Sequence, residues 1–164
     1  MKTAYKALLE KVNNQPRILK HSITAIKKMR KGDADSLLHG LHEKAFETIN
    51  CLECANCCTT VGPLLTSKEI ERIAKHLALK PVVFINQFLI LDEDNDYVFK
   101  SMPCPFLGSD NYCSIYEQRP KACREYPHTN RKNQQGILSL TKKNATLCPA
   151  VAQIFINIDS QKNS

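Results

Sequence analysis

The apolar residues of the first 30 positions recur at the spacing of an α-helix, which predicts amphipathic helices. Asn13 to Pro16 interrupts this pattern, and a proline suits the first turn of a second helix. A stripe of this kind usually packs on the rest of a protein. Its members are Leu8, Leu9, Val12, Ile18, Leu19, Ile23, Ile26 and Met29.

Further helices are predicted across the middle of the chain. A break at residues 31–33 precedes a helix over about Asp35 to Asn50, which leads into the first group of cysteines. Thr66 and Glu69 have the spacing of a capping box and predict the start of a helix. Pro81 predicts the start of a further short helix.

The remaining elements include one pair of strands. Residues 97–99 predict a short strand whose partner is expected at residues 137–140, and Asp92 to Asp96 predicts a solvated acidic turn. Residues 151–158 predict a closing helix. The predicted fold is an α-rich α+β domain, with small helices around irregular cysteine-bearing loops and one short β-hairpin.

Charge is distributed unevenly over the 164 residues. Residues 1–32 contain nine Lys and Arg against one acid, Glu10, whereas the rest contains 14 basic and 15 acidic residues. We therefore predict a basic helical N-terminal extension over residues 1–32, followed by the cysteine-bearing domain over residues 33–164. Metal binding is expected to be independent of this extension. The extension offers a surface for an unknown protein partner, whereas nucleic acid is disfavoured because no aromatic interleaving or nucleic-acid motif accompanies the charge.

The N-terminus contains no apolar segment of signal-peptide length, since Lys6, Glu10 and Lys11 interrupt it. The apolar stretch at residues 81–91 is too short and too polar to span a bilayer, so no membrane association is expected. We therefore expect a cytoplasmic protein, in which thiols remain reduced. The eight cysteines are then better explained as metal ligands than as disulfide partners.

The densest group of cysteines is Cys51, Cys54, Cys57 and Cys58. Gaps of two residues allow a tight turn to direct successive thiolates at one centre. Adjacent cysteines point in different directions, so Cys57 and Cys58 either serve two centres or include one spare thiol. Replacing Cys54 with serine is expected to remove metal and lower stability together.

Four more cysteines are dispersed at Cys104, Cys113, Cys123 and Cys148, and two of them precede a proline. All eight are candidate metal ligands. They suit two four-thiolate sites or one cluster with additional thiols. Bacterial ferredoxins also combine a C-x2-C-x2-C run with a Cys-Pro, although at another spacing, and no second C-x2-C knuckle is present for a usual zinc site.

Residues near Cys123 have predicted supporting roles. Arg119 and Arg124 are candidates to offset thiolate charge, whereas Lys121 is interpreted as ordinary surface charge. In the connector before Cys123, Ile115 and Tyr116 are expected to fill the core, while Tyr116 or Arg119 is an alternative hydrogen-bond donor to sulfur.

The order of these motifs resembles the CxxCxxCC cysteine-cluster family, also called YkgJ-like proteins. The resemblance rests on the run at residues 51–58, Cys104-Pro-Phe-Leu-Gly, the segment from Cys113 to Pro120, Cys123-Arg-Glu-Tyr-Pro and Cys148-Pro, and it covers roughly residues 50–150. It implies a small bacterial cytosolic domain that chelates zinc or iron. A larger relative, the flagellin lysine N-methylase, carries the same cysteine pattern and is associated with an iron–sulfur cluster.

Three functions follow, in order of preference. The first is a protein that holds an iron–sulfur cluster, of the 4Fe-4S type, with a redox or sensing role. The second is a structural zinc protein or adaptor, since zinc also accepts four thiolates. The third is a component of a methyl-transfer enzyme, which rests on the relative alone, because no glycine-rich loop for S-adenosylmethionine is present. No catalytic residue is predicted outside the cysteines.

Overall fold

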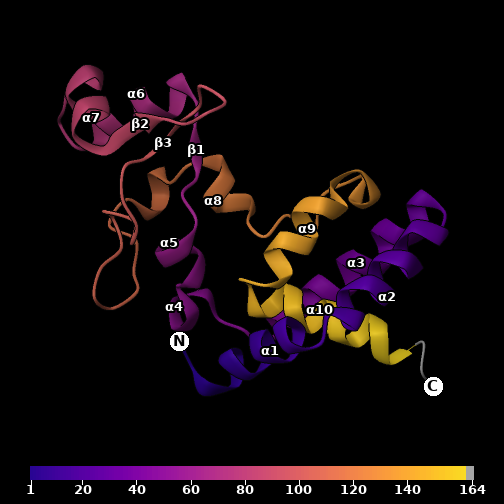
Figure 1. Ribbon diagram of the computed structural model, residues 1–164. Coiled ribbons are helices and arrows are strands. Elements are labelled where there is room, and N and C mark those ends of the chain that lie inside the picture. The colour runs from indigo at the N-terminus through magenta and orange to yellow at the C-terminus, as the bar shows by residue number, and fades with distance from the viewer. Residues whose placement is uncertain (162–164) are drawn as a thin grey trace. The chain divides into compact units, whose positions relative to one another are not determined.

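The computed structural model describes residues 1–161 and confirms an α-rich α+β fold. Its elements are labelled in Figure 1. They divide into two compact units: unit 1 comprises residues 1–54 and 127–164, and unit 2 comprises residues 55–126. The sequence suggested a boundary near residue 32, whereas this division falls after Cys54 and after Tyr126.

Unit 1 is helical. The N-terminal part contains α1 (Thr3–Asn14), α2 (Pro16–Lys28), α3 (Lys31–Phe46) and α4 (Cys51–Cys54). The C-terminal part contains the 3-10 helix η2 (Gln134–Ile137), α9 (Leu138–Ala145) and α10 (Pro149–Gln161). The largely apolar α10 packs against α1, α2, α3 and α9, so it forms the centre of this unit (Figure 1).

The predicted apolar stripe of the N-terminal segment packs into this core, as expected. Pro16 occupies the first turn of α2, where its missing N–H costs no hydrogen bond. The buried side chains of α1 and α2 are Tyr5, Leu9, Val12, Ile18, Leu19, Ser22 and Ile26. Residues 1–32 are therefore part of the folded body of unit 1.

Unit 2 combines short helices with a small sheet. Its helices are α5 (Asn56–Thr60), α6 (Ser67–His76), α7 (Pro81–Phe88), the 3-10 helix η1 (Tyr116–Gln118) and α8 (Lys121–Glu125). Its strands β1 (Leu64–Leu65), β2 (Leu89–Leu91) and β3 (Tyr97–Phe99) form an antiparallel sheet in the order β1-β3-β2. The ring of Phe106 contacts those of Phe84, Phe88 and Phe99 in the core, and Phe84 also contacts Phe88.

The predicted β-hairpin is present, but its expected partner strand is wrong. Strand β3 pairs with β2 through the register Ile90 to Val98, and Asp92 Oδ1 accepts the N–H groups of Asp94 and Asp96 in the turn. Residues 137–140 instead enter helix α9, where Leu138 is buried in unit 1. A short segment with three apolar residues in four fits a helix as well as a strand, and packing decides between them.

The helix expected over residues 35–50 begins four residues earlier and ends at Phe46. Gly32 lies inside its first turn, and the actual break is at the extended residues Met29 and Arg30. No helix in the described part of the chain combines the length and apolarity that a bilayer crossing requires.

Candidate metal centre

The structure places the eight cysteines in two sets. None of the eight cysteines forms a disulfide within residues 1–161. Unit 1 contains Cys51, Cys54 and Cys148. Cys51 is exposed, Cys148 is buried and the others are half-buried. The cysteines of unit 2 are Cys57, Cys58, Cys104, Cys113 and Cys123.

The division into units passes through the dense cysteine run itself. Cys51 and Cys54 are the two ends of α4, whereas Cys57 and Cys58 lie in α5. Between them, Ala55 has φ 49°, in the left-handed region that residues with a Cβ rarely adopt. Ala55 therefore ends one short helix and starts the next, which a pattern of cysteine spacings does not reveal.

The thiols of Cys57 and Cys58 lie close together, with 3.9 Å between their sulfur atoms. The hydrogen bond with Cys57 lowers the pKa of Cys58 to about 7, and the nearby Arg119 guanidinium also lowers it. Cys58 is thus more easily converted to the thiolate that binds metal than Cys104, Cys113 or Cys123, whose pKa values are raised.

Cys104 and Cys113 lie on a loop with an ordered backbone. Cys104 N–H donates to Cys58 O at 2.8 Å, and Leu107 forms an isolated β-bridge with Cys113. Gly108 N–H donates to Tyr112 O at 2.8 Å, which closes the loop. Cys104 and Cys113 also pack against the apolar core that contains Phe106, and this packing holds the loop on the core.

Cys123 reaches the same region because α8 is tied to α6. Lys121 N–H donates to Glu69 Oε1 at 2.6 Å, and Glu69 Oε2 accepts from the N–H and the hydroxyl of Thr66. The predicted capping role of Glu69 is confirmed, and its second oxygen fixes the start of the helix that carries Cys123. Burial raises the pKa of Glu69, but these donors together outweigh burial and leave it below its usual value.

The buried thiols of unit 2 resist ionisation without a cation. Burial, with a smaller effect from neighbouring thiols, raises the pKa of Cys104 to about 11 and that of Cys123 to about 12. The neighbours of Cys123 include Cys58, Cys104 and Cys113, which shows that four thiols share one region of unit 2. A metal cation would favour their thiolate forms.

Arg119 supplies positive charge to this set, as the sequence suggested. Its guanidinium lowers the pKa of Cys58, Cys113 and Cys123. It stacks over the Tyr116 ring at 3.5 Å and donates to Tyr116 O at 2.9 Å. The expected core role holds for the buried Ile115, but Tyr116 is 37% exposed and instead carries Arg119 on its ring.

The other two basic candidates act elsewhere. Arg124 donates to Arg119 O at 3.4 Å, next to the segment that presents Arg119. The Lys121 ammonium lies 3.6 Å from the Glu125 carboxylate, and both side chains are well exposed, in agreement with ordinary surface charge.

In unit 1, Cys148 immediately precedes α10. Burial raises the pKa of Cys148 to about 12, although the N–H groups of Val151 and Ala150 act in the opposite direction. The thiols of Cys51 and Cys54 also raise it, so all three sulfur atoms lie in one electrostatic neighbourhood. Cys148 N–H donates to Asn144 O at 2.7 Å, which fixes the turn between α9 and α10.

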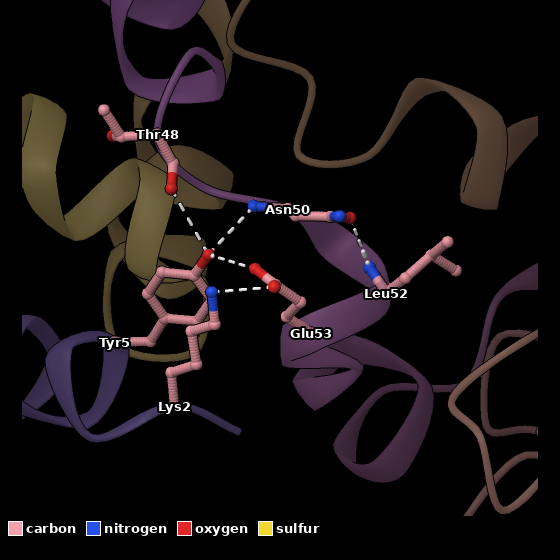
Figure 2. Close-up of polar contacts among 6 residues, drawn as sticks. All are labelled: Lys2, Tyr5, Thr48, Asn50, Leu52 and Glu53. Atoms are coloured by element: carbon pink, nitrogen blue, oxygen red, sulfur yellow. Dashed lines mark hydrogen bonds and ion pairs between the residues drawn. The ribbon is translucent and has the colours of Figure 1, made fainter.

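A polar network holds α4 against the start of the chain (Figure 2). The Tyr5 hydroxyl lies 3.1 Å from Glu53 Oε2 and 3.3 Å from Thr48 O, and it accepts the N–H of Asn50 at 3.0 Å. Lys2 Nζ lies 2.7 Å from Glu53 Oε1. Glu53 lies between Cys51 and Cys54 in α4, so residues outside the cysteine pattern position two thiols.

Replacing Tyr5 with phenylalanine is expected to destabilise unit 1 by about 1–2 kcal/mol and to weaken its metal retention. The ring would remain in the core, while Asn50 N–H and Glu53 would lose a shared partner. Urea unfolding and metal analysis measure the two effects. Tyr112→Phe is the matched control, because Tyr112 lies 46% exposed in unit 2, and equal effects from the two variants would contradict the positioning role.

Within residues 1–161, no three His, Cys, Asp or Glu side chains are arranged to hold a metal ion as they stand. The donor chemistry nevertheless fits a thiophilic metal, because the thiols of Cys58, Cys104 and Cys113 raise the pKa of Cys123, and those of Cys51 and Cys54 raise the pKa of Cys148. Metal binding would draw the sulfur atoms of such loops together, since ligation and local folding are linked.

Comparison with known proteins agrees with this donor set. Residues 50–149, more than half of the chain, match the model of the CxxCxxCC family, described as a "putative zinc- or iron-chelating domain". No curated protein matches the chain significantly, and no solved structure does so. The matched region contains Cys51 through Cys148, and therefore every cysteine of the chain. The chain belongs to the CxxCxxCC family of zinc- or iron-chelating domains.

Proposed function

We propose that this protein holds an iron–sulfur cluster of the 4Fe-4S type through cysteine thiolates and has a redox or sensing role in the cytoplasm. The observation that carries the proposal is the set of four neighbouring thiols in unit 2, from Cys58, Cys104, Cys113 and Cys123. Sulfur is the donor that protein-bound iron–sulfur clusters require.

The surroundings of these thiols support the proposal. Four thiolates bring four negative charges, and Arg119 offsets part of this charge from a fixed position over Tyr116. Backbone N–H groups of Phe106 and Leu107 lower the pKa of Cys104, and that of Ile115 lowers the pKa of Cys113. N–H groups directed at sulfur tune the reduction potential of a bound cluster.

The apolar core beside the four thiols of unit 2 also suits an iron–sulfur cluster. Phe106 is 6% exposed and lies two residues after Cys104, in contact with the rings of Phe84, Phe88 and Phe99. This apolar side limits the access of water and oxidants to the thiols from the core.

Anaerobic purification followed by visible spectroscopy and a count of iron, sulfide and zinc per chain tests this function. We expect a brown protein that contains iron and sulfide and is bleached by dithionite. A colourless protein with stoichiometric zinc and no sulfide would replace the cluster with a structural zinc site. A preparation that binds neither metal would reject both.

A further inference from the structure

The thioether sulfur of Met1 lies beside a thiol of the dense cysteine run. Met1 Sδ is 3.8 Å from Cys54 Sγ, although 53 positions separate the two residues along the chain, and both residues belong to unit 1. Met1 lies outside residues 50–149, which match the family model. Neither the spacing of the cysteines nor the family therefore assigns a role to this contact.

We propose that the Met1 thioether is a further sulfur donor to the metal that Cys54 binds. This inference rests on the metal binding of the proposed function, but it does not depend on whether the metal is iron or zinc. Thioether sulfur is a soft donor that, like thiolate, suits thiophilic metals. Because it is neutral, it adds a ligand without adding negative charge to a site that already contains thiolates.

The distance between the two sulfur atoms agrees with coordination of one ion. A tetrahedral zinc site places each sulfur ligand about 2.3 Å from the metal, so two such ligands lie about 3.8 Å apart along an edge of the tetrahedron. Met1 Sδ and Cys54 Sγ have this separation. An ion at bonding distance from both atoms therefore needs no change in the distance between them.

The contact is held by residues next to each sulfur atom. Lys2 follows Met1, and its Nζ lies 2.7 Å from Glu53 Oε1 (Figure 2). Glu53 in turn precedes Cys54 in α4. An exposed ion pair contributes little by itself, but the hydroxyl of the buried Tyr5 also lies 3.1 Å from Glu53 Oε2. The start of the chain is therefore fixed on α4 at the position where Met1 meets Cys54.

Core packing does not account for the position of Met1. Its side chain is 40% exposed, whereas a methionine that fills a gap in a core is enclosed by apolar neighbours. Cys54 is half-buried. A metal ion from solution can therefore reach both sulfur atoms, and a site of this kind needs such an entry path.

X-ray absorption at the selenium edge of the full chain tests the bond to the metal. The chain contains three methionines, so Met29→Leu and Met102→Leu leave Met1 as the single site of selenomethionine. In protein purified anaerobically with its metal, we expect a metal atom in the first shell of selenium, beside its two carbon neighbours. A shell of carbon atoms alone, in protein that contains metal, would overturn the inference.

Met1→Leu gives a second readout, because leucine keeps the apolar bulk and lacks sulfur. The variant and the wild type are both released from a cleavable N-terminal fusion, so that each begins at residue 1. We expect a chelator to remove metal from the variant at least about tenfold faster, since even an indirect partner of a metal ligand contributes roughly 10–100-fold to metal affinity.

Met29→Leu, at the end of α2, is the matched control and should lose metal at the wild-type rate. Equal rates in Met1→Leu and Met29→Leu would show that the Met1 sulfur is not a donor. Absence of metal from the wild type would instead reject the proposed function, which keeps the two failures distinct.

Discussion

Deletion of residues 1–32 is expected to unfold unit 1 and to abolish metal binding by Cys51, Cys54 and Cys148. The deleted segment supplies α1, α2 and the start of α3, together with Tyr5 of the network around α4. Burial of one large apolar side chain contributes about 1.5–3 kcal/mol, whereas an entire domain is stable by only about 5–15 kcal/mol. The loss of Leu9, Val12, Ile18, Leu19 and Ile26 therefore exceeds what the remaining helices can compensate.

Circular dichroism, thermal unfolding and metal counts measure this effect. The matched control keeps the helices and removes charge, through Lys20→Gln, Lys27→Gln and Lys28→Gln at exposed positions of α2. This control should unfold like the wild type and retain its metal. A truncated protein that still unfolds cooperatively with all of its metal would contradict this prediction and support the sequence-based expectation that residues 1–32 are dispensable for metal binding.

Cys104→Ser is expected to destabilise the metal-loaded protein by more than the roughly 0.5–3 kcal/mol that is typical of single substitutions. Structural metal sites contribute folding free energy directly, and an incomplete thiolate set forfeits much of that contribution. Cys104 is only half-buried and its replacement is nearly isosteric, so packing alone predicts a small effect.

Urea unfolding with and without a chelator separates the two causes. In metal-free protein, the variant and the wild type should unfold within about 1 kcal/mol of each other. With metal bound, the wild type alone should gain the full stabilisation of unit 2. An equal difference under both conditions would show that Cys104 acts through packing and is not a ligand. Ser114→Ala, in the same loop, is a control that leaves every thiol in place.

Local signals in the sequence predicted much of the secondary structure. Pro16 and Pro81 start helices as their fixed φ predicts, and Glu69 caps α6. These features depend on neighbours within a few positions. The strand partner of residues 97–99 was wrong because pairing depends on distant residues, and residues 138–140 instead form the start of α9, where Leu138 is buried.

The candidate site shows the same limit. The sequence identified all eight cysteines, but it could not group them, since Cys54 and Cys58 are close along the chain and lie in different units. The left-handed turn at Ala55 separates Cys51 and Cys54 of α4 from Cys57 and Cys58 of α5. The hydrogen bond from Lys121 N–H to Glu69 positions the helix of Cys123. Neither feature has a recognisable sequence motif. The role of Tyr5 was missed for the same reason, because 48 positions separate it from Glu53.

The central claim is that cysteine thiolates of this chain bind the metal. X-ray absorption at the edge of the metal found in anaerobically purified, full-length protein tests it most directly. We predict a nearest shell of sulfur atoms, accompanied by neighbouring iron atoms if the metal belongs to a cluster. A nearest shell dominated by nitrogen or oxygen would contradict the claim.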